Sequence, residues 1–483
     1  MEETLLVIDT GSSSMRSVLF DKYGRILEKY QTFYQMKIDG IKATQEIEDF
    51  SNALIKLVQK SVAYVRQHNL KIKSISFTSQ RSSLVVLDEK MQVVLPVIMW
   101  YDKRSAIICQ NLNAEHGNKI KAITGSLATP VMLAPKIQYF EQNSELALHA
   151  AYYMSIQDYL IWLTCGKMIT DPTLGCKTNL MDLQKNQWSD ELLALYKIDK
   201  KKLCKIIPCG SIAGYVMKAF EDLTGLTEGI PVITAGGDQQ CSLLGQMLDY
   251  KSEMALTLGS GGYAVMTVEQ IPQEIPDYVT VSASAWQGFY NLEIGIEKLG
   301  TLFDWCRNQF PQKDRNPKDF ILLAQKANKT NARTEITMEQ LKKCMIQNMD
   351  LKKEYFKDLD NETNYSHKAM AILNCIIQEI SETYFKMCKA TNKKVNIKIA
   401  GGMAKSDCIC QMIVDTTSAV ICRNKEVETT AVGAWLQSTV ALEIENSISK
   451  AIKRYKNNNG NQNTIFYNKT INKKPANKKS RLN

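Results

Sequence analysis

The chain has 483 residues, of which 45% are hydrophobic and 23% charged, so it is long enough for two globular domains and has an ordinary globular composition. Its formal net charge is +10, but residues 456–483 hold seven Lys or Arg and no acid, which leaves about +3 on the rest. We therefore expect no nucleic-acid partner, and we interpret 456–483, rich in Lys and Asn, as a disordered tail.

The sequence also excludes several kinds of site. No apolar run is long enough to cross a bilayer, and the acidic start Met1-Glu2-Glu3 is unlike a secretory signal. We expect a cytoplasmic protein with no membrane partner. The thirteen cysteines are scattered, with no Cys-x-x-Cys pair, which argues against a zinc site. None of the four histidines has a recognisable catalytic setting, so we expect a carboxylate as any general base.

The first predicted element, over residues 5–20, is a pair of apolar β-type runs around a tight turn of Gly and hydroxyl residues. Asp9 lies at the mouth of the turn, and Arg16 follows it. Small residues let an anion approach the backbone N–H groups of such a turn, and the Arg guanidinium suits phosphate oxygens. By itself, the pattern fits an ordinary hairpin equally well. A strand over 26–33 would extend the hairpin to a meander.

The following segments alternate between helical and strand-like periodicity. We predict a helix over 50–67, strands over 73–78, 84–87 and 96–100, interrupted helices over 105–165, an ordered loop over 170–182 and a short helix over 188–195 that is capped by Ser189.

A strand over 230–235 then breaks at Gly236-Gly237-Asp238-Gln239-Gln240, and a helix follows from Cys241. This arrangement exposes Asp238 at the carboxyl end of a strand, where α/β proteins place ligands. The alternative is that Asp238 only caps the helix.

A second hairpin resembles the first one. An apolar strand over 254–258 leads into Gly259-Ser260-Gly261-Gly262 and returns over 263–266. Two phosphate-sized hairpins about half a chain apart indicate two related domains that face each other across a nucleotide.

Beyond this hairpin we predict amphipathic helices over 292–306 and 367–388, on either side of a polar stretch. A strand over 395–399 ends at Gly401-Gly402, where a flat adenine or ribose could lie on the backbone, although a plain connection is nearly as good an interpretation. A last helix opens at Glu428 and ends the globular part near residue 455.

With these segments in order, residues 4–455 resemble the FGGY carbohydrate kinases, the family of glycerol kinase, xylulokinase and gluconokinase. Each motif is weak alone, but their order and spacing are specific. The motifs are Asp9-Thr10-Gly11-Ser12-Ser13-Ser14-Met15-Arg16, Gln80-Arg81, Trp100-Tyr101-Asp102-Lys103-Arg104, Gly236-Gly237-Asp238-Gln239-Gln240, Gly259-Ser260-Gly261, Gly401-Gly402-Met403-Ala404-Lys405-Ser406 and Glu428-Thr429-Thr430-Ala431-Val432-Gly433-Ala434.

The resemblance implies an α/β, two-domain actin-like ATPase fold (ribonuclease H-like) with an interdomain cleft. The N-terminal domain, 1–245, would form the sugar and phosphate side, and the C-terminal domain, 246–455, the nucleotide side. The implied reaction is ATP- and Mg²⁺-dependent phosphorylation of a hydroxyl of a sugar or polyol, by in-line transfer with an Asp general base. A homodimer is possible in this family.

The resemblance also implies residue roles. Asp238 would be the base, and Asp9 and Asp238 would serve the metal. The residues expected at the substrate are Gln80, Arg81, Trp100, Asp102 and Gln239. Those expected at ATP are Thr10, Gly11, Ser12, Ser13, Arg16, Gly259, Ser260, Gly261, Gly401, Gly402 and Ser406.

Departures from the family pattern narrow the substrate. Ser82 replaces the Glu of glycerol kinases, and Val131 replaces a pocket Tyr, which argues against glycerol and leaves room for a longer polyol or sugar. The turn 79–83 differs from that of xylulokinases. A Gly/Pro-rich segment of the family is reduced, within 308–366, to a hint at 331–334.

That reduced segment motivates a second hypothesis, a catalytically weakened sugar- and nucleotide-binding regulator of the same fold. A third hypothesis is an actin-like filament or chaperone ATPase, which would share only the fold with the carbohydrate kinases. The sequence leaves open which sugar is used and which hydroxyl is phosphorylated.

Overall fold

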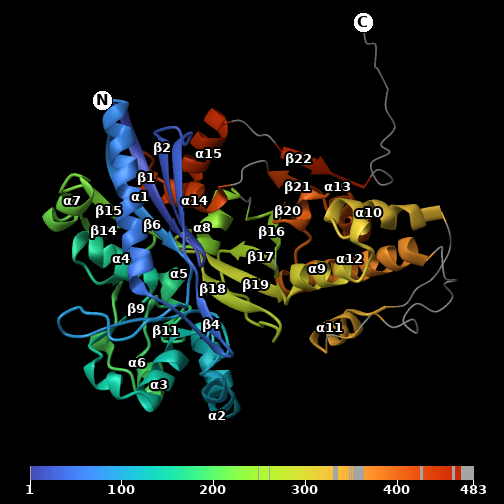
Figure 1. Ribbon diagram of the computed structural model, residues 1–483, viewed down its shortest axis with the longest axis horizontal. Coiled ribbons are helices and arrows are strands. Elements are labelled where there is room, and N and C mark those ends of the chain that lie inside the picture. The colour runs from blue at the N-terminus through green and yellow to red at the C-terminus, as the bar shows by residue number, and fades with distance from the viewer. Residues whose placement is uncertain are drawn as a thin grey trace, which may run out of the picture.

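The structure is a computed structural model of the chain. It describes residues 2–247, 250–259, 261–329, 336–347, 349, 351, 364–424, 428–459 and 463–468. Two lobes lie side by side, each built on one mixed β-sheet with helices packed on its faces (Figure 1).

The first sheet has the strand order β14-β15-β6-β1-β2-β3. Strands β1 to β3 form an antiparallel meander, while β6 and β15 run parallel to β1. Residues Thr4–Thr10 are buried throughout, as expected of a central strand covered on both faces. The bounds are β1 (Glu2–Thr10), β2 (Ser14–Asp21), β3 (Ile26–Phe33), β6 (Leu70–Ser79), β14 (Ser211–Tyr215) and β15 (Pro231–Gly237).

The second sheet repeats this topology. Its order is β18-β19-β17-β16-β20-β21-β22, in which β16, β17 and β19 form the meander, β20 runs parallel to β16, and β21 parallel to β20. The two Gly-rich hairpins therefore occupy equivalent places, as the sequence predicts. The bounds are β16 (Glu253–Leu258), β17 (Gly262–Val268), β18 (Thr280–Ala283), β19 (Tyr290–Ile296), β20 (Asn396–Ala400), β21 (Ile421–Asn424) and β22 (Asn463–Phe466).

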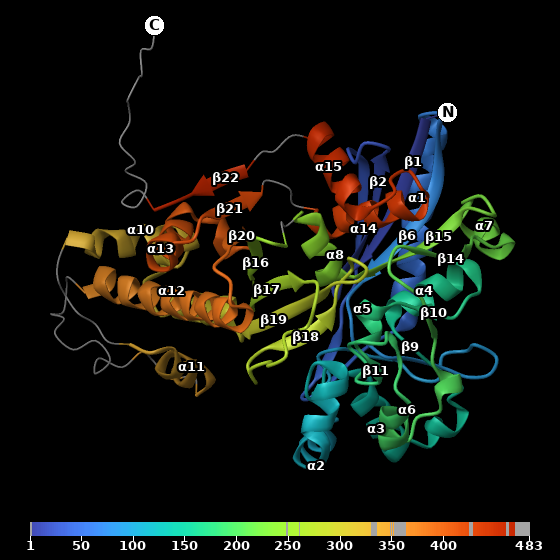
Figure 2. The same cartoon turned by 180° about the vertical axis from the view of Figure 1, so that it is seen from behind.

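Helices from both halves of the chain cover the first sheet. Helix α1 (Ile47–Gln67) and α4 (Ile156–Cys165) pack on one face. On the other face lie α8 (Asp238–Gly245), α14 (Thr429–Ala441) and α15 (Ile448–Asn459), so the two C-terminal helices lie beside β1 and β2 in both views (Figures 1 and 2). Helices α14 and α15 of the C-terminal half therefore pack on the first lobe. A domain boundary at residue 245 does not separate the two lobes completely.

The contact between α8 and α14 depends on two glycines. A Cβ on Gly245 would lie 1.8 Å from the Thr429 carbonyl oxygen, and one on Gly433 would lie 1.9 Å from that of Cys241. Only a residue without a side chain allows the helix backbones to approach this closely.

The remaining elements complete the two lobes. Helices α9 (Leu299–Asn308), α10 (Pro317–Gln325), α11 (Met338–Ile346), α12 (Asn364–Thr391) and α13 (Asp407–Thr417) belong to the second lobe. The first lobe contains α2 (Ala106–Thr124), α3 (Leu133–Asn143), α5 (Pro172–Gly175), α6 (Asp190–Tyr196), α7 (Lys218–Thr224) and the short strands β4 (Lys37–Asp39), β5 (Lys42–Gln45), β7 (Val85–Leu87), β8 (Val97–Ile98), β9 (Tyr152–Met154), β10 (Ile169–Thr170), β11 (Met181–Asp182), β12 (Gln187–Trp188) and β13 (Lys205–Ile206).

Several sequence predictions about local structure are wrong. The single last helix predicted from Glu428 to near residue 455 is two helices, α14 and α15, and the loop predicted over 170–182 contains α5. Residues 290–296 form strand β19 rather than the start of a helix, because Leu292, Ile294 and Ile296 are buried with the period of two that a strand requires. Helix α8 begins at Asp238, not at Cys241. The tail is ordered at 456–459, in α15, and at 463–466, where β22 pairs with β21.

Two other predictions, for the segment 331–334 and for the end of the tail from 469 onward, concern residues outside the described ranges. In the part of the chain that is described, no helix is long and apolar enough to span a bilayer.

Candidate active site

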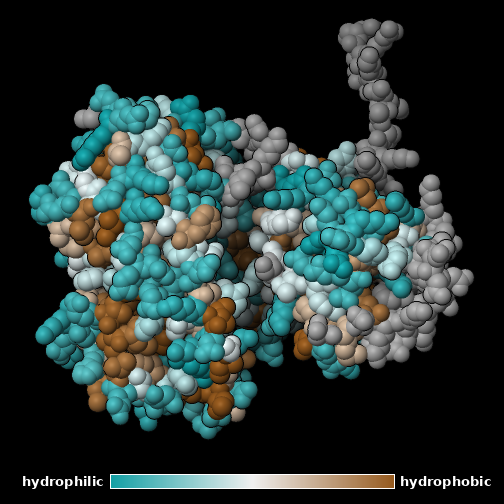
Figure 3. Space-filling model, viewed as in Figure 1, coloured by the Kyte–Doolittle hydropathy of each residue, from teal (hydrophilic) through white to brown (hydrophobic). Residues whose placement is uncertain are grey.

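A cavity of about 450 Å³ lies between the lobes, and both lobes contribute to its walls. Figure 3 shows the molecule hollowed between the two lobes. The first lobe contributes six residues that the sequence singles out, namely Ser12, Gln80, Arg81, Trp100, Asp238 and Gln239. The second lobe contributes Tyr263, Asp277, Val279, Thr280 and Glu293. Ser82 and Val131, the two departures from the glycerol kinase pattern, also line this cavity.

The turn between β1 and β2 forms one wall of the cavity. Trp100 Nε1 donates to Ser12 Oγ (2.8 Å), and Ser12 Oγ donates to Gln80 Oε1 (3.2 Å). Gln80 is buried, and its backbone N–H donates to the Thr10 carbonyl (2.7 Å). Ser12, expected at ATP, therefore borders the predicted substrate side, and Gln80 fixes the position of the turn.

Asp238 lies beside Arg81 in this cavity. The Asp238 Oδ1 accepts from the Gln239 N–H (2.7 Å) and lies 3.9 Å from Arg81 Nε, while Arg81 Nη2 donates to Gln239 Oε1. Burial raises the pKa of Asp238, and the Arg81 charge and the hydrogen bond from Gln239 oppose this rise only in part. A carboxyl group with a raised pKa is suited to accept a proton.

The end of β15 fixes the backbone at Asp238. The Gly237 N–H donates to Thr173 Oγ1 (2.7 Å), and Thr173 Oγ1 donates to the buried Asp171 (2.5 Å). Gly236 has a φ of 111°, in the region that favours glycine, and a Cβ on Gly237 would lie 2.6 Å from Arg81 Cδ. Asp238, the first residue of α8, is therefore positioned through the contact between Gly237 and Thr173 as well as by its own helix.

Sequence analysis missed Asp171 and Thr173, which lie in the predicted ordered loop. Asp171 also accepts from Gln157 Nε2 (2.8 Å) and Thr234 Oγ1 (2.6 Å), so it joins α4, α5 and β15. The available signal was Asp171-Pro172-Thr173, an Asp N-cap followed by Pro at the first helical position.

A second group of charges lies next to the turn of the first hairpin. Arg16 Nη2 contacts Asp9 Oδ2 (2.7 Å), and Arg16 Nη1 contacts Glu428 Oε2 (2.9 Å). Lys29 Nζ lies 2.6 Å from Glu428 Oε1. Burial raises the pKa of Asp9 to about 6; the Arg16 charge lowers it, and the charges of Asp238 and Glu428 raise it further. Arg16, expected at phosphate, is thus held between two carboxylates.

The residues expected around ATP in the second lobe have different environments. A Cβ on Gly401, whose φ is 100°, would lie 2.4 Å from the Leu258 carbonyl oxygen, whereas one on Gly402 would meet open space. Ser406 is the N-cap of α13 and accepts from the Ile409 N–H (3.4 Å). Gly259 and Gly261 are joined by a backbone hydrogen bond (3.0 Å) across the hairpin turn. The intervening residue, Ser260, lies outside the described residues.

Asp102 is not among the residues that line the cavity. It is buried, accepts from the Ala43 N–H (2.9 Å) and forms an ion pair with Arg104 (2.9 Å). These contacts fix the loop after Trp100. The prediction of Asp102 at the substrate therefore has no geometric support.

Two lysines near the cavity were also missed. Lys136 is buried, and its ammonium donates to the carbonyls of Ser82 (3.0 Å) and Val131 (2.5 Å), so it ties two cavity loops together. Lys177 lines the cavity and lies 3.4 Å from Glu293 of the second lobe. Neither lysine belongs to a motif, so the sequence gives no signal for either.

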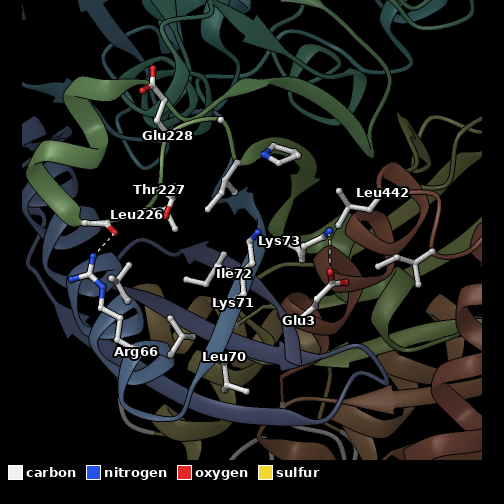
Figure 4. A pocket seen from close by; sticks show the side chains of 17 residues that line it. Glu3, Arg66, Leu70, Lys71, Ile72, Lys73, Leu226, Thr227, Glu228 and Leu442 are labelled. Carbon is white, nitrogen blue, oxygen red and sulfur yellow. Dashed lines mark hydrogen bonds and ion pairs between the residues drawn. The ribbon is translucent and has the colours of Figure 1, made fainter. Parts of the chain in front are cut away.

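A larger cavity, of about 780 Å³, lies at the opposite edge of the first sheet, beside the amino ends of its parallel strands (Figure 4). Glu3, Leu70 and Pro231, at the amino ends of β1, β6 and β15, line it. Asp9 and Asp238 lie at the opposite, carboxyl ends of these parallel strands, where α/β sheets bind ligands. We therefore assign the candidate active site to the cavity between the lobes.

Known proteins resemble this chain over most of its length. Family models for the FGGY family of carbohydrate kinases match the chain over residues 4–245 (N-terminal domain) and 254–442 (C-terminal domain). A glycerol kinase of Dichelobacter nodosus is 26% identical over 90% of this chain and 89% of its own length. A xylulose kinase of Lactococcus lactis is 29% identical over 57% of this chain and 54% of its own length.

Solved structures share the fold. The gluconate kinase of Lactobacillus acidophilus superposes with a TM-score of 0.86 at 22% identity, over 98% of this chain and 94% of that one. The Plasmodium falciparum glycerol kinase with ADP gives 0.84 at 19% identity, over 97% and 94%. The predicted α/β, two-domain actin-like fold is confirmed.

Proposed function

This chain belongs to the FGGY family of carbohydrate kinases, and we propose that it transfers a phosphoryl group from ATP to a hydroxyl of a sugar or polyol bound between its lobes. The observation that carries the proposal is the position of Asp238. Its carboxylate lines the cavity between the lobes, next to Arg81 and Gln239, and burial raises its pKa.

Asp238 has the properties of the general base. It would accept the proton of the acceptor hydroxyl as the oxygen attacks, and its raised pKa brings it closer to the pH at which transfer occurs. Arg81 supports the same step. It lines the cavity, and its guanidinium contacts Asp238 and Gln239. Gln239 and Trp100 complete the polar and aromatic contacts expected of a sugar site.

The residues at the first hairpin fit a magnesium nucleotide. Asp9 and Asp238 present carboxylate oxygens, the ligands that Mg²⁺ prefers, and the charge of Asp238 is close enough to raise the pKa of Asp9. Among the described residues, no group of three or more His, Cys, Asp or Glu could hold a metal by itself. That agrees with Mg²⁺, which usually binds one or two carboxylates, substrate phosphates and water.

We assign ATP to the two hairpins and the glycine pair of the second lobe. Thr10, Gly11, Ser13 and Arg16 would approach the phosphates from the first lobe, with Gly259, Ser260 and Gly261 opposite, and Gly401, Gly402 and Ser406 would border the adenosine. Bound Mg²⁺-ATP would supply the phosphoryl group and neutralise its charge. The protein's contribution is to position the acceptor and to exclude water as the lobes close.

Neither alternative hypothesis gains support from an observation in the described residues. A regulator without catalysis has no need for a carboxyl in the cavity between the lobes, yet Asp238 occupies that position. A filament or chaperone ATPase has no need for Arg81, Trp100 and Gln239 around one cavity.

The proposal is tested by ADP release with ATP and Mg²⁺ over a panel of ketoses, aldoses, alditols and sugar acids. We expect at least one acceptor to raise ADP release well above the ATP-only rate. Bound ATP without transfer to any acceptor of the panel would contradict the proposal.

A further inference from the structure

Two charged pairs join the lobes at the cavity and have no role in the mechanism above, Lys121 with Asp277 and Lys177 with Glu293, and the second pair is the more buried. Lys177 follows α5 in the first lobe, and Glu293 lies in β19 of the second lobe. Their side chains are only 13% and 11% exposed, and Lys177 Nζ lies 3.4 Å from Glu293 Oε2. Both residues line the cavity that contains Asp238.

Glu293 is an ionised carboxylate in this setting. Burial acts to raise its pKa, but the charges of Lys177 and Arg81 outweigh burial and hold the pKa below its usual range. Ser282 donates to Oε1 and Lys177 donates to Oε2. Each carboxylate oxygen accepts more than one hydrogen bond, so Glu293 can accept further bonds from a ligand.

The charges along the cavity wall balance. Each cation has a carboxylate beside it: Lys177 and Glu293 at 3.4 Å, Lys121 and Asp277 at 2.7 Å, and Arg81 and Asp238 at 3.9 Å. The negative charge of an acidic substrate would lie close to these carboxylates and be repelled by them, because each cation of the cavity wall is already paired with a carboxylate. A hydroxyl group avoids this cost, because it accepts from the ammonium and donates to the carboxylate at once.

We propose that Lys177 and Glu293 recognise the end of the acceptor remote from the reacting hydroxyl, and that the acceptor is a neutral polyol or sugar longer than three carbons. This inference rests on the proposed function of the cavity. Arg81 is linked to both groups: its guanidinium contacts Asp238 and Gln239, and its charge acts on Glu293. The cavity of about 450 Å³ that Asp238 and Glu293 share has room for an acceptor longer than a three-carbon triol.

The test compares wild type with Glu293→Gln and Lys177→Gln, using glycerol, xylitol, D-xylulose and D-gluconate as acceptors. We expect xylitol or D-xylulose to be used better than glycerol and gluconate. Each variant should lower kcat/KM for the longer neutral acceptor about tenfold or more, mainly through KM, with less than a twofold change for glycerol. The double variant should lose little more than either single one, because the two residues act as a pair.

The controls separate recognition from folding. Glu297→Gln changes an exposed residue just after the same strand and should leave all acceptors unchanged. Thermal melting of each variant checks the fold. Preference for gluconate, or an equal loss for glycerol and the longer acceptors, would overturn the inference.

Binding gives a readout that does not require phosphoryl transfer. If no acceptor releases ADP, the proposed function fails, and calorimetry with xylitol and glycerol then tests the inference alone. Tighter binding of xylitol that Glu293→Gln abolishes would support it. Equal binding of the two, or binding of neither, would overturn it.

Discussion

Arg16 and Glu428 are 412 positions apart in the chain, yet Arg16 Nη1 and Glu428 Oε2 lie 2.9 Å apart. The same guanidinium contacts Asp9, and the same carboxylate contacts Lys29. This chain of charges joins the first hairpin, where we propose the phosphates bind, to the start of α14. Through it, the C-terminal half of the protein fixes a group at the carboxyl edge of the first sheet.

Glu428→Gln should destabilise the protein. The change removes a charge partner of both Arg16 and Lys29 at a site where Glu428 is 8% exposed. Because Arg16 and Lys29 are 31% and 43% exposed, we expect the free energy of unfolding to fall by about 2 kcal/mol, between the ranges for exposed and buried pairs. Chemical denaturation measures this loss. Glu46→Gln, which breaks the exposed pair with Lys37, is the control and should cost less than about 1 kcal/mol. Equal effects of the two changes would contradict the account.

Asp9→Asn should stabilise the ligand-free protein while it removes activity. Burial raises the pKa of Asp9 from 3.8 to about 6, so between these values the folded protein keeps a proton that the unfolded chain has released. The wild-type free energy of unfolding therefore falls as the pH rises through this window, and remains lowered above it. Asn carries no charge at any pH.

We expect Asp9→Asn to exceed wild type by up to about 3 kcal/mol at pH 7.5 and by much less near pH 4, in denaturant titrations at both pH values. Asp415→Asn, at an exposed residue of α13, should show no such pH-dependent difference. A variant that is less stable than wild type by the same amount at both pH values would refute the prediction.

Thr173 is a positioning residue for Asp238. Thr173→Val keeps the shape but removes the oxygen that accepts from the Gly237 N–H, so the start of α8 loses its anchor. We expect kcat to fall about tenfold or more with little change in KM, because a small displacement of a reacting group is costly. Thr173→Ser keeps the hydroxyl and should restore kcat. A loss of thermal stability with kcat unchanged would show that the role is only structural.

The sequence predicts much of this molecule because local and global signals agree there. The apolar runs in Leu5–Phe20 and in 254–266, each interrupted by a Gly-rich turn, identify two equivalent hairpins. The helix over 50–67 and the strand over 26–33 follow from periodicity and are confirmed. Leu292–Ile296 was misassigned because a five-residue alternation next to a true helix also fits a helical pattern.

The parts that the sequence did not predict depend on long-range contacts. Lys177 and Glu293 are 116 positions apart, and Asp171 and Thr234 are 63 apart, so no local pattern joins them. Asp102 lies in a family motif, but its partners Ala43 and Arg104 show that it holds a loop. A motif identifies a local arrangement of the chain, and only the fold shows which of its residues line the cavity.

The central claim is that Asp238 accepts the proton of the acceptor hydroxyl. The most direct test is acceptor-dependent ADP release by Asp238→Asn beside wild type, with Asp222→Asn, at an exposed residue of α7, as a control. ATP binding, measured by thermal shift, checks that the variant keeps its fold and its nucleotide site. In Asp238→Asn, kcat should fall roughly 10²- to 10⁴-fold while ATP still binds. A variant that retains kcat within a few-fold of wild type would show that Asp238 is not the base.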